Sequence, residues 1–208
     1  MGGRRVLRVT GIRRRAAVVA ASVAVVALVA GCGDPPEPLT DGPAGAAPAD
    51  GLTRVVDLAA ERAVLSDRVA AAKAGTGQPV TDPAREKVVV DDARADAARD
   101  GVDPEWTARV FADQIAASTQ VQEDLLRRWT EQPGARPAPV DLAQVRPELD
   151  RIGDELVAAL KLATPARAHE DCASSLAQAA VTRSATLDDV HRAALGRALM
   201  SVCDGTPE

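Results

Sequence analysis

Apolar residues recur at alternating spacings of three and four from about Leu52 to the end of the chain, which is the period of α-helices with one buried face. Strand-like alternation with a period of two is scarce, and no hairpin turn motif is present. We therefore predict an all-α fold. About six helices are expected, covering residues 52–73, 83–101, 104–131, a segment from between 141 and 147 to just before 165, 166–182 and 187–202.

Two of these helix starts are marked by local sequence. Asp82-Pro83 and Asp103-Pro104 each place an N-cap aspartate before a proline at the first helical position. The chain has one phenylalanine, two tryptophans and no tyrosine, so small aliphatic side chains must build most of the core.

The third predicted helix carries polar residues on the face that should be buried. Its inward stripe reads Phe111, Ile115, Ser118, Gln122, Leu125 and Trp129. Four members are apolar, but a hydroxyl and an amide occupy the middle. A stripe of this kind indicates either an unusual polar core or a helix that faces a pocket.

The first predicted helix repeats the anomaly with charges. Arg62 and Lys73 lie on its otherwise apolar stripe, eleven residues apart, which is roughly 16 Å along the axis. Buried cations need negative partners, because an unpaired buried charge is costly. Periodicity leaves two interpretations open: a structural ion-pair network or a pocket for an anionic ligand. The network would use acids such as Glu61, Asp67, Asp82 or Glu86.

The N-terminus has the pattern of an export signal. Residues 1–31 contain six arginines and then an apolar run over residues 16–30, which is short for a membrane span. The run ends in LVAGC, which resembles a bacterial lipobox with Cys32 as the lipidated residue. Residues 32–50, rich in proline and glycine, are expected to be a flexible tether to a domain over 51–208. An uncleaved anchor and an ordinary cleaved signal are the alternatives.

Charge and cysteine content agree with export. The whole chain has 25 basic and 30 acidic residues, so without the six signal arginines it carries 19 against 30, a formal charge of −11. Such an acidic protein is not expected to bind nucleic acid. Cys172 and Cys203 are expected to form a disulfide between two C-terminal helices, with two free buried thiols as the alternative. No metal site is predicted, and His169 and His191 are expected on the surface.

Five polar positions carry a resemblance to a known family. Arg62, Lys73, Arg85, Ser118 and Gln122 follow one another at intervals of eleven, twelve, thirty-three and four. Together with the stretches ERAVLSDRVAAAK, DPAREK, DPEWTARVFADQI and STQVQ, this order resembles the all-helical (AroQ-class) chorismate mutases. The export signal, the helical C-terminal region and the two C-terminal cysteines resemble the gamma, or secreted, subclass. The resemblance covers about residues 52–203.

The resemblance implies a reaction and a role for each residue. Chorismate mutases rearrange chorismate, a dianion, to prephenate without a cofactor or covalent step, by holding the substrate in a compact geometry and stabilising charge on its ether oxygen. Lys73 and Gln122 would donate to the ether oxygen. Arg85 and Ser118 would hold one carboxylate, and Arg62 and Arg146 would hold the other. Asp82 and Glu86 would bind the substrate hydroxyl. The resemblance also implies a homodimer. From the lipobox-like end of the export signal, the chain is expected to be lipid-anchored to the outer side of the cytoplasmic membrane or to the cell envelope, with or without later release.

Two departures and two alternatives accompany this interpretation. Some secreted relatives carry glutamate at the position of Gln122, and Pro147 directly after Arg146 predicts a late or kinked start of the fourth helix. The main alternative function is a helical lipoprotein that binds an anionic ligand or partner without catalysis. A hydrolase is disfavoured, because Ser118 has no histidine near it in the sequence and lies in no nucleophile motif.

Overall fold

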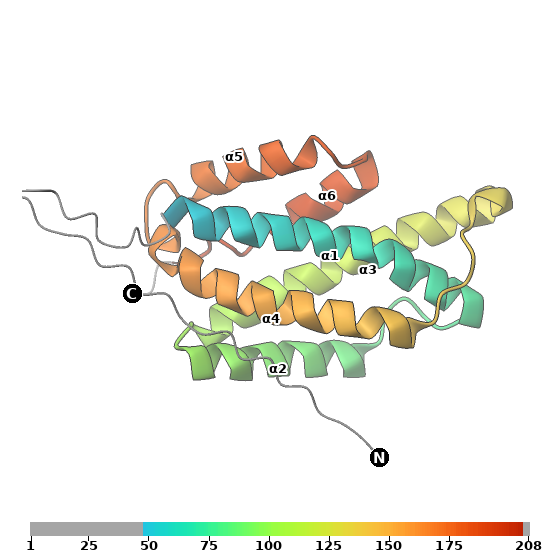
Figure 1. Ribbon diagram of the computed structural model, residues 1–208, viewed down its shortest axis with the longest axis horizontal. Helices are drawn as coiled ribbons and strands as arrows, with labels where there is room; N and C mark the ends of the chain where they lie inside the picture. Colours follow the sequence, from blue (N-terminus) through green and yellow to red (C-terminus); the bar gives the residue numbers. More distant parts are fainter. Residues whose placement is uncertain (1–47, 206–208) are drawn as a thin grey trace, which may run out of the picture. The chain divides into compact units, whose positions relative to one another are not determined.

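The protein is described by a computed structural model that covers residues 48–205. Six α-helices and one short 3₁₀ turn make up most of this part of the chain, and none of its residues forms a strand (Figure 1). The helices are α1 (Pro48–Thr76), α2 (Pro83–Asp100), α3 (Pro104–Glu131), α4 (Leu142–Arg167), α5 (Cys172–Ser184) and α6 (Asp189–Ala198), with the turn η1 (Pro133–Ala135) between α3 and α4. The all-α prediction with about six helices is confirmed.

The two predicted N-caps are formed as expected. The Asp82 carboxylate accepts from the backbone N–H of Arg85 at 3.1 Å, and that of Asp103 accepts from Glu105 and Trp106 at 3.0 Å each. α2 ends at Gly101, whose φ of +74° is the left-handed conformation that favours glycine at a helix end. α1 begins at Pro48, three residues before the predicted start of the domain.

The prediction that the fourth helix ends before Pro165 is wrong. α4 contains both Pro147 and Pro165 and continues to Arg167. The break is avoided in the last turn because the carbonyl that Pro165 leaves without a donor belongs to Lys161, which is exposed to water. The buried Arg167 guanidinium also fixes the helix end, donating to the Asp103 carboxylate at 3.1 Å and to the Asp204 carbonyl at 3.0 Å.

α1 is the helix around which the others are arranged. Figure 1 shows it between α4 on one side and the α5–α6 pair on the other, and it also packs against α3. The approach to α4 is close at Gly51, where a Cβ would lie 2.6 Å from the backbone nitrogen of Ala163. α2 packs against α3 and α4, so α1, α2, α3 and α4 enclose the space between them.

α5, α6 and the residues after α6 form a C-terminal cap over α1 and α3. The predicted disulfide joins Cys172, at the start of α5, to Cys203, in the turn after α6, with Cα atoms 5.8 Å apart. The Trp106 indole donates to the Ser201 carbonyl at 3.0 Å, and the Gln114 amide donates to a carbonyl at the end of α6. The disulfide therefore links two parts of the cap to each other, while the hydrogen bonds of Trp106 and Gln114 join the cap to α3.

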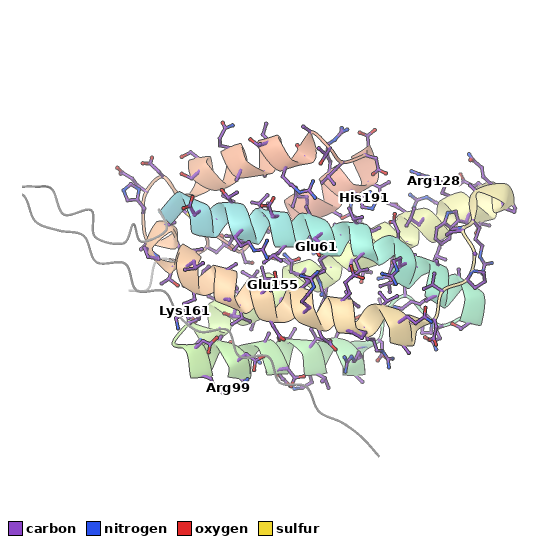
Figure 2. All side chains as sticks on the ribbon, viewed as in Figure 1. Glu61, Arg99, Arg128, Glu155, Lys161 and His191 are labelled. Atoms are coloured by element: carbon purple, nitrogen blue, oxygen red, sulfur yellow. A yellow bond between two sulfur atoms is a disulfide. The ribbon has the colours of Figure 1, made fainter. Side chains whose placement is uncertain are left out.

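One histidine was wrongly predicted. His169 is exposed, but His191 on α6 is buried and lies between the carboxylates of Asp188, at 2.7 Å, and Asp67 on α1, at 2.9 Å (Figure 2). Hydrogen bonding to Asp67, more than to Asp188, raises the pKa of His191. The ring therefore joins the cap to α1 through charged hydrogen bonds.

The predicted export segment and tether fall largely outside the described residues, as does Cys32. Among the helices within residues 48–205, none is both long and apolar enough to cross a membrane.

Candidate active site

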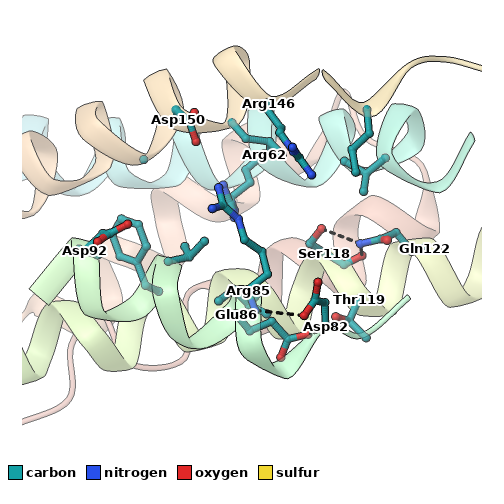
Figure 3. Close-up of a pocket in the computed structure, with 18 of the residues that line it drawn as sticks. Arg62, Asp82, Arg85, Glu86, Asp92, Ser118, Thr119, Gln122, Arg146 and Asp150 are labelled. Atoms are coloured by element: carbon teal, nitrogen blue, oxygen red, sulfur yellow. Dashed lines mark hydrogen bonds between the residues drawn. The ribbon is translucent and has the colours of Figure 1, made fainter. Parts of the chain in front are cut away.

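A cavity of about 770 Å³ lies between α1, α2, α3 and α4. Eight of its lining residues are those singled out from the sequence: Arg62, Lys73, Asp82, Arg85, Glu86, Ser118, Gln122 and Arg146. They come from four helices and the α1–α2 connection, so only the tertiary fold brings them together (Figure 3). The polar stripes of α1 and α3 therefore face one pocket.

Arg62 is the most deeply buried charged residue of the pocket. It is 9% exposed, and its Nε has no hydrogen-bond partner. Burial lowers its pKa to about 10, and the charge of Asp150 only partly opposes this effect. No carboxylate of the described residues lies within ion-pair distance of its guanidinium, so its charge has no ion-pair partner among them.

The acids that could have neutralised Arg62 have partners elsewhere. Glu61 pairs with Arg151 on the outer surface of α1 and α4 (Figure 2), and Asp67 pairs with His191. Asp82 caps α2, while Glu86 accepts from the Asp82 backbone N–H at 3.0 Å. The structural ion-pair network is therefore not formed around Arg62, and the anion-binding interpretation is the one that the geometry supports.

Two further arginines point into the cavity without a carboxylate partner among the described residues. Figure 3 shows Arg85 rising from α2 and Arg146 descending from α4 toward the space beside Arg62. Arg146 reaches the pocket although Pro147 follows it, because α4 begins earlier, at Leu142, where the Asp141 carboxylate accepts from the Ala143 N–H at 2.9 Å. Pro147 lies in the second turn of α4, where it removes one backbone hydrogen bond, to the Ala143 carbonyl, and the helix continues through it.

Lys73 lies at the other end of the α1 stripe. It is half-buried, and its ammonium donates to the Val80 carbonyl in the α1–α2 connection. Burial lowers the pKa of Lys73, and the nearby charges of Glu86 and Asp82 act in the opposite direction. An ammonium has three hydrogens, so two are left for other acceptors.

Ser118 and Gln122 form the floor of the pocket on α3. The Gln122 amide nitrogen lies 3.1 Å from both the Ser118 hydroxyl and the Ser118 carbonyl, and its oxygen is buried without a partner. The Ser118 hydroxyl also lies 2.8 Å from the hydroxyl of Ser66 on α1. An amide oxygen and an arginine that both lack partners in one pocket are typical of a site that a ligand completes.

Comparison with known proteins agrees with this geometry. A family model described as chorismate mutase type II matches residues 53–123. A secreted chorismate mutase of Mycolicibacterium smegmatis is 34% identical over 186 residues, which cover 88% of this chain and 98% of that relative. The chain belongs to this chorismate mutase family. A secreted chorismate mutase of Mycobacterium tuberculosis is 31% identical over 159 residues, covering 75% of this chain and 80% of the relative.

Solved chorismate mutase structures share the fold. That of Burkholderia thailandensis has 38% sequence identity and a TM-score of 0.70, covering 74% of this chain and 99% of its own. That of Burkholderia phymatum has 36% identity and a TM-score of 0.70, covering 76% of this chain and 98% of its own.

The pocket of this chorismate mutase type II chain includes residues that the sequence analysis missed. Asp92 and Asp96 on α2, and Asp150 and Asp154 on α4, also line the cavity. Asp150 is one helical turn after Arg146, so this spacing could have indicated that both residues face the pocket. Within residues 48–205, no group of three or more Asp, Glu, His or Cys side chains is arranged to hold a metal ion.

Proposed function

We propose that this protein rearranges chorismate to prephenate in the pocket between α1, α2, α3 and α4. The observation that carries the proposal is Arg62, a buried arginine with an unbonded Nε and no carboxylate partner among the described residues. A dianionic substrate supplies the missing negative charge. The rearrangement breaks a C–O bond while a C–C bond forms, so it requires positioning and electrostatic stabilisation and no nucleophile.

The three arginines hold the two carboxylates. Arg62 and Arg146, from α1 and α4, take one carboxylate, while Arg85 with the Ser118 hydroxyl takes the other. A guanidinium can donate two parallel hydrogen bonds to one carboxylate, which fixes orientation as well as position. Holding both carboxylates constrains the flexible substrate to the compact conformer from which the new bond forms.

Lys73 and Gln122 stabilise the ether oxygen. Negative charge grows on this oxygen as its C–O bond breaks, so donors aimed at it bind the transition state more tightly than the substrate. A lysine ammonium and a neutral amide both donate, and the amide does so without a change of protonation. Gln122 has two amide hydrogens, so it keeps one on the Ser118 hydroxyl and turns the other from the Ser118 carbonyl to the ether oxygen. Asp82 and Glu86, at the start of α2, are suited to accept from the substrate hydroxyl.

The cellular setting forms part of the proposal. Both curated relatives are named as secreted enzymes, which supports export of this chain. We infer further that residues 1–31 direct export, that Cys32 carries a lipid and that residues 32–50 tether the catalytic domain over 51–208. This lipid would be the only attachment of the chain to the membrane. The functional unit would be a homodimer, and the protein would not bind nucleic acid.

Turnover by the folded chain tests the function. The protein without its first 31 residues is produced in an oxidising compartment, and the disappearance of chorismate is followed. Arg62→Ala should lower kcat/KM on the order of 100-fold or more, because it removes a buried charged donor. Arg68→Ala, which removes an exposed arginine further along the same helix, α1, is the matched control and should change little.

Two outcomes would reject the proposal. One is a well-folded protein whose turnover does not exceed the uncatalysed rate. The other is an Arg62→Ala variant as active as Arg68→Ala. Tight binding of chorismate without turnover would instead identify the non-catalytic, anion-binding lipoprotein.

A further inference from the structure

Ser66 is a fully buried hydroxyl directly behind the pocket. It lies on α1, one turn after Arg62, and does not line the cavity itself. Its Oγ is 3.0 Å from the Arg62 carbonyl and 2.8 Å from the Ser118 hydroxyl on α3. The first contact is an ordinary bond within a helix, whereas the second joins two helices at a residue that faces the pocket.

The hydrogens of these groups can be accounted for. A serine hydroxyl has one hydrogen and two acceptor positions. The Arg62 carbonyl can only accept, so the hydrogen of Ser66 goes either to that carbonyl or to Ser118. If the Ser66 hydrogen goes to the carbonyl, Ser118 must donate its own hydrogen to Ser66 and has none left for a ligand.

The second arrangement prepares Ser118 for an anion. When Ser66 donates to Ser118, the Ser118 oxygen accepts from Ser66 at 2.8 Å and from the Gln122 amide at 3.1 Å. Both of its acceptor positions are then filled from inside the protein. Its own hydrogen is left to point into the pocket, where the arginines attract a carboxylate.

We propose that Ser66 is a positioning residue for the reaction, acting through Ser118 on the substrate carboxylate and on the Gln122 amide. The inference rests on the proposed function and extends it to a residue outside the pocket wall. Carboxylate binding draws the Ser118 hydrogen into the cavity, and the Ser66 hydrogen turns from the Arg62 carbonyl to Ser118. Each donor in this chain polarises the next, so the bond to the carboxylate is strengthened.

Ser66→Ala tests this role with little risk to folding, because alanine favours helix and neighbouring inward positions of α1, such as Ala63 and Ala70, are already alanine. We expect kcat/KM to fall about tenfold, the effect of losing one hydrogen bond of roughly 1.4 kcal/mol. KM should rise because the carboxylate is held less well, and kcat should fall because the Gln122 amide is less well oriented.

The control and the double variant separate positioning from packing. Thr107 on α3 is also fully buried, and its hydroxyl donates to the Asp103 carbonyl at 3.0 Å within its own helix. Thr107→Val should leave kcat and KM unchanged. In a Ser118→Ala background, Ser66→Ala should cause no further loss of kcat/KM, since the residue through which it acts is gone.

The outcomes distinguish this inference from the function itself. If the unmodified protein turns over chorismate but Ser66→Ala is as active, the inference is wrong and the proposed function stands. The inference would also be wrong if the double variant lost kcat/KM by the product of the losses in Ser66→Ala and Ser118→Ala. If the unmodified protein shows no turnover, both are rejected.

Discussion

The amide at position 122 offers the sharpest test of the mechanism. Gln122 is 4% exposed and lies in a pocket with three unpaired arginines and Lys73. Gln122→Glu keeps the shape of the side chain but allows donation to the ether oxygen only when the carboxyl is protonated. We expect the unmodified enzyme to have a nearly flat kcat/KM between pH 5 and 8, and the variant to lose activity as pH rises.

The size of this loss follows from the pKa that the new glutamate would have. An unperturbed glutamate titrates at about 4.3, burial would raise this value, and the surrounding cations would lower it. For a pKa between about 4.3 and 6, the protonated fraction falls roughly 10- to 100-fold from pH 5 to pH 7. The rate of the variant should fall by the same factor.

The assay is steady-state turnover of chorismate at half-unit steps from pH 4.5 to 8.5. Gln120→Glu is the matched control, because Gln120 lies two residues earlier on α3 and lines a neighbouring cavity instead of the pocket. Its pH profile should match that of the unmodified enzyme. A flat, fully active Gln122→Glu variant would refute the assignment of Gln122 to the ether oxygen.

Three other substitutions test separate parts of the structure. Lys73→Met should lower kcat by roughly 100- to 1,000-fold with a smaller change in KM, and a pure rise in KM in steady-state assays would contradict its role at the ether oxygen. Because Asp67 and Asp188 raise the pKa of His191 above 6.5, its contribution to stability is complete below pH 6.5 and lost as pH rises through the higher folded value. Urea unfolding from pH 6 to pH 9 should therefore show a loss of stability that His191→Gln lacks. If the free energy of unfolding changes with pH in the same way in both proteins, His191 does not make this contribution. Gly51→Ala should lower the free energy of unfolding by about 1–3 kcal/mol, measured in the same way, since its Cβ would meet the α4 backbone, and unchanged stability would mean that α1 and α4 can separate at no cost.

Local signals predicted the helices well where one residue decides a boundary. An N-cap aspartate followed by proline predicted helix starts at Asp82-Pro83 and Asp103-Pro104, and both starts are present in the structure. The end of α4 was mispredicted, because Pro165 acts within a helix whose last turn is held by distant groups on Asp103 and Asp204. Tertiary contacts overrode a local helix-breaking residue.

The site was predicted in part for the same reason. Periodicity placed Arg62 and Gln122 on inward faces, but it could not decide between an ion-pair network and a ligand pocket. That choice depended on where Glu61 points, and its partner, Arg151, is 90 residues away in the chain. The burial of His191 depended in the same way on Asp67, 124 residues away.

The near absence of aromatic residues gives this protein a built-in optical probe. With no tyrosine and two tryptophans in the whole chain, near-ultraviolet fluorescence comes from Trp106 and Trp129. Trp106 is fully buried, its ring 4.4 Å from the Arg167 guanidinium carbon and its indole bonded to the Ser201 carbonyl beside the disulfide. Detachment of the cap from α3 would expose this ring and shift its emission to longer wavelength, while Trp129, near the far end of α3, would serve as an internal reference. The attachment of the cap can therefore be followed in solution without a label.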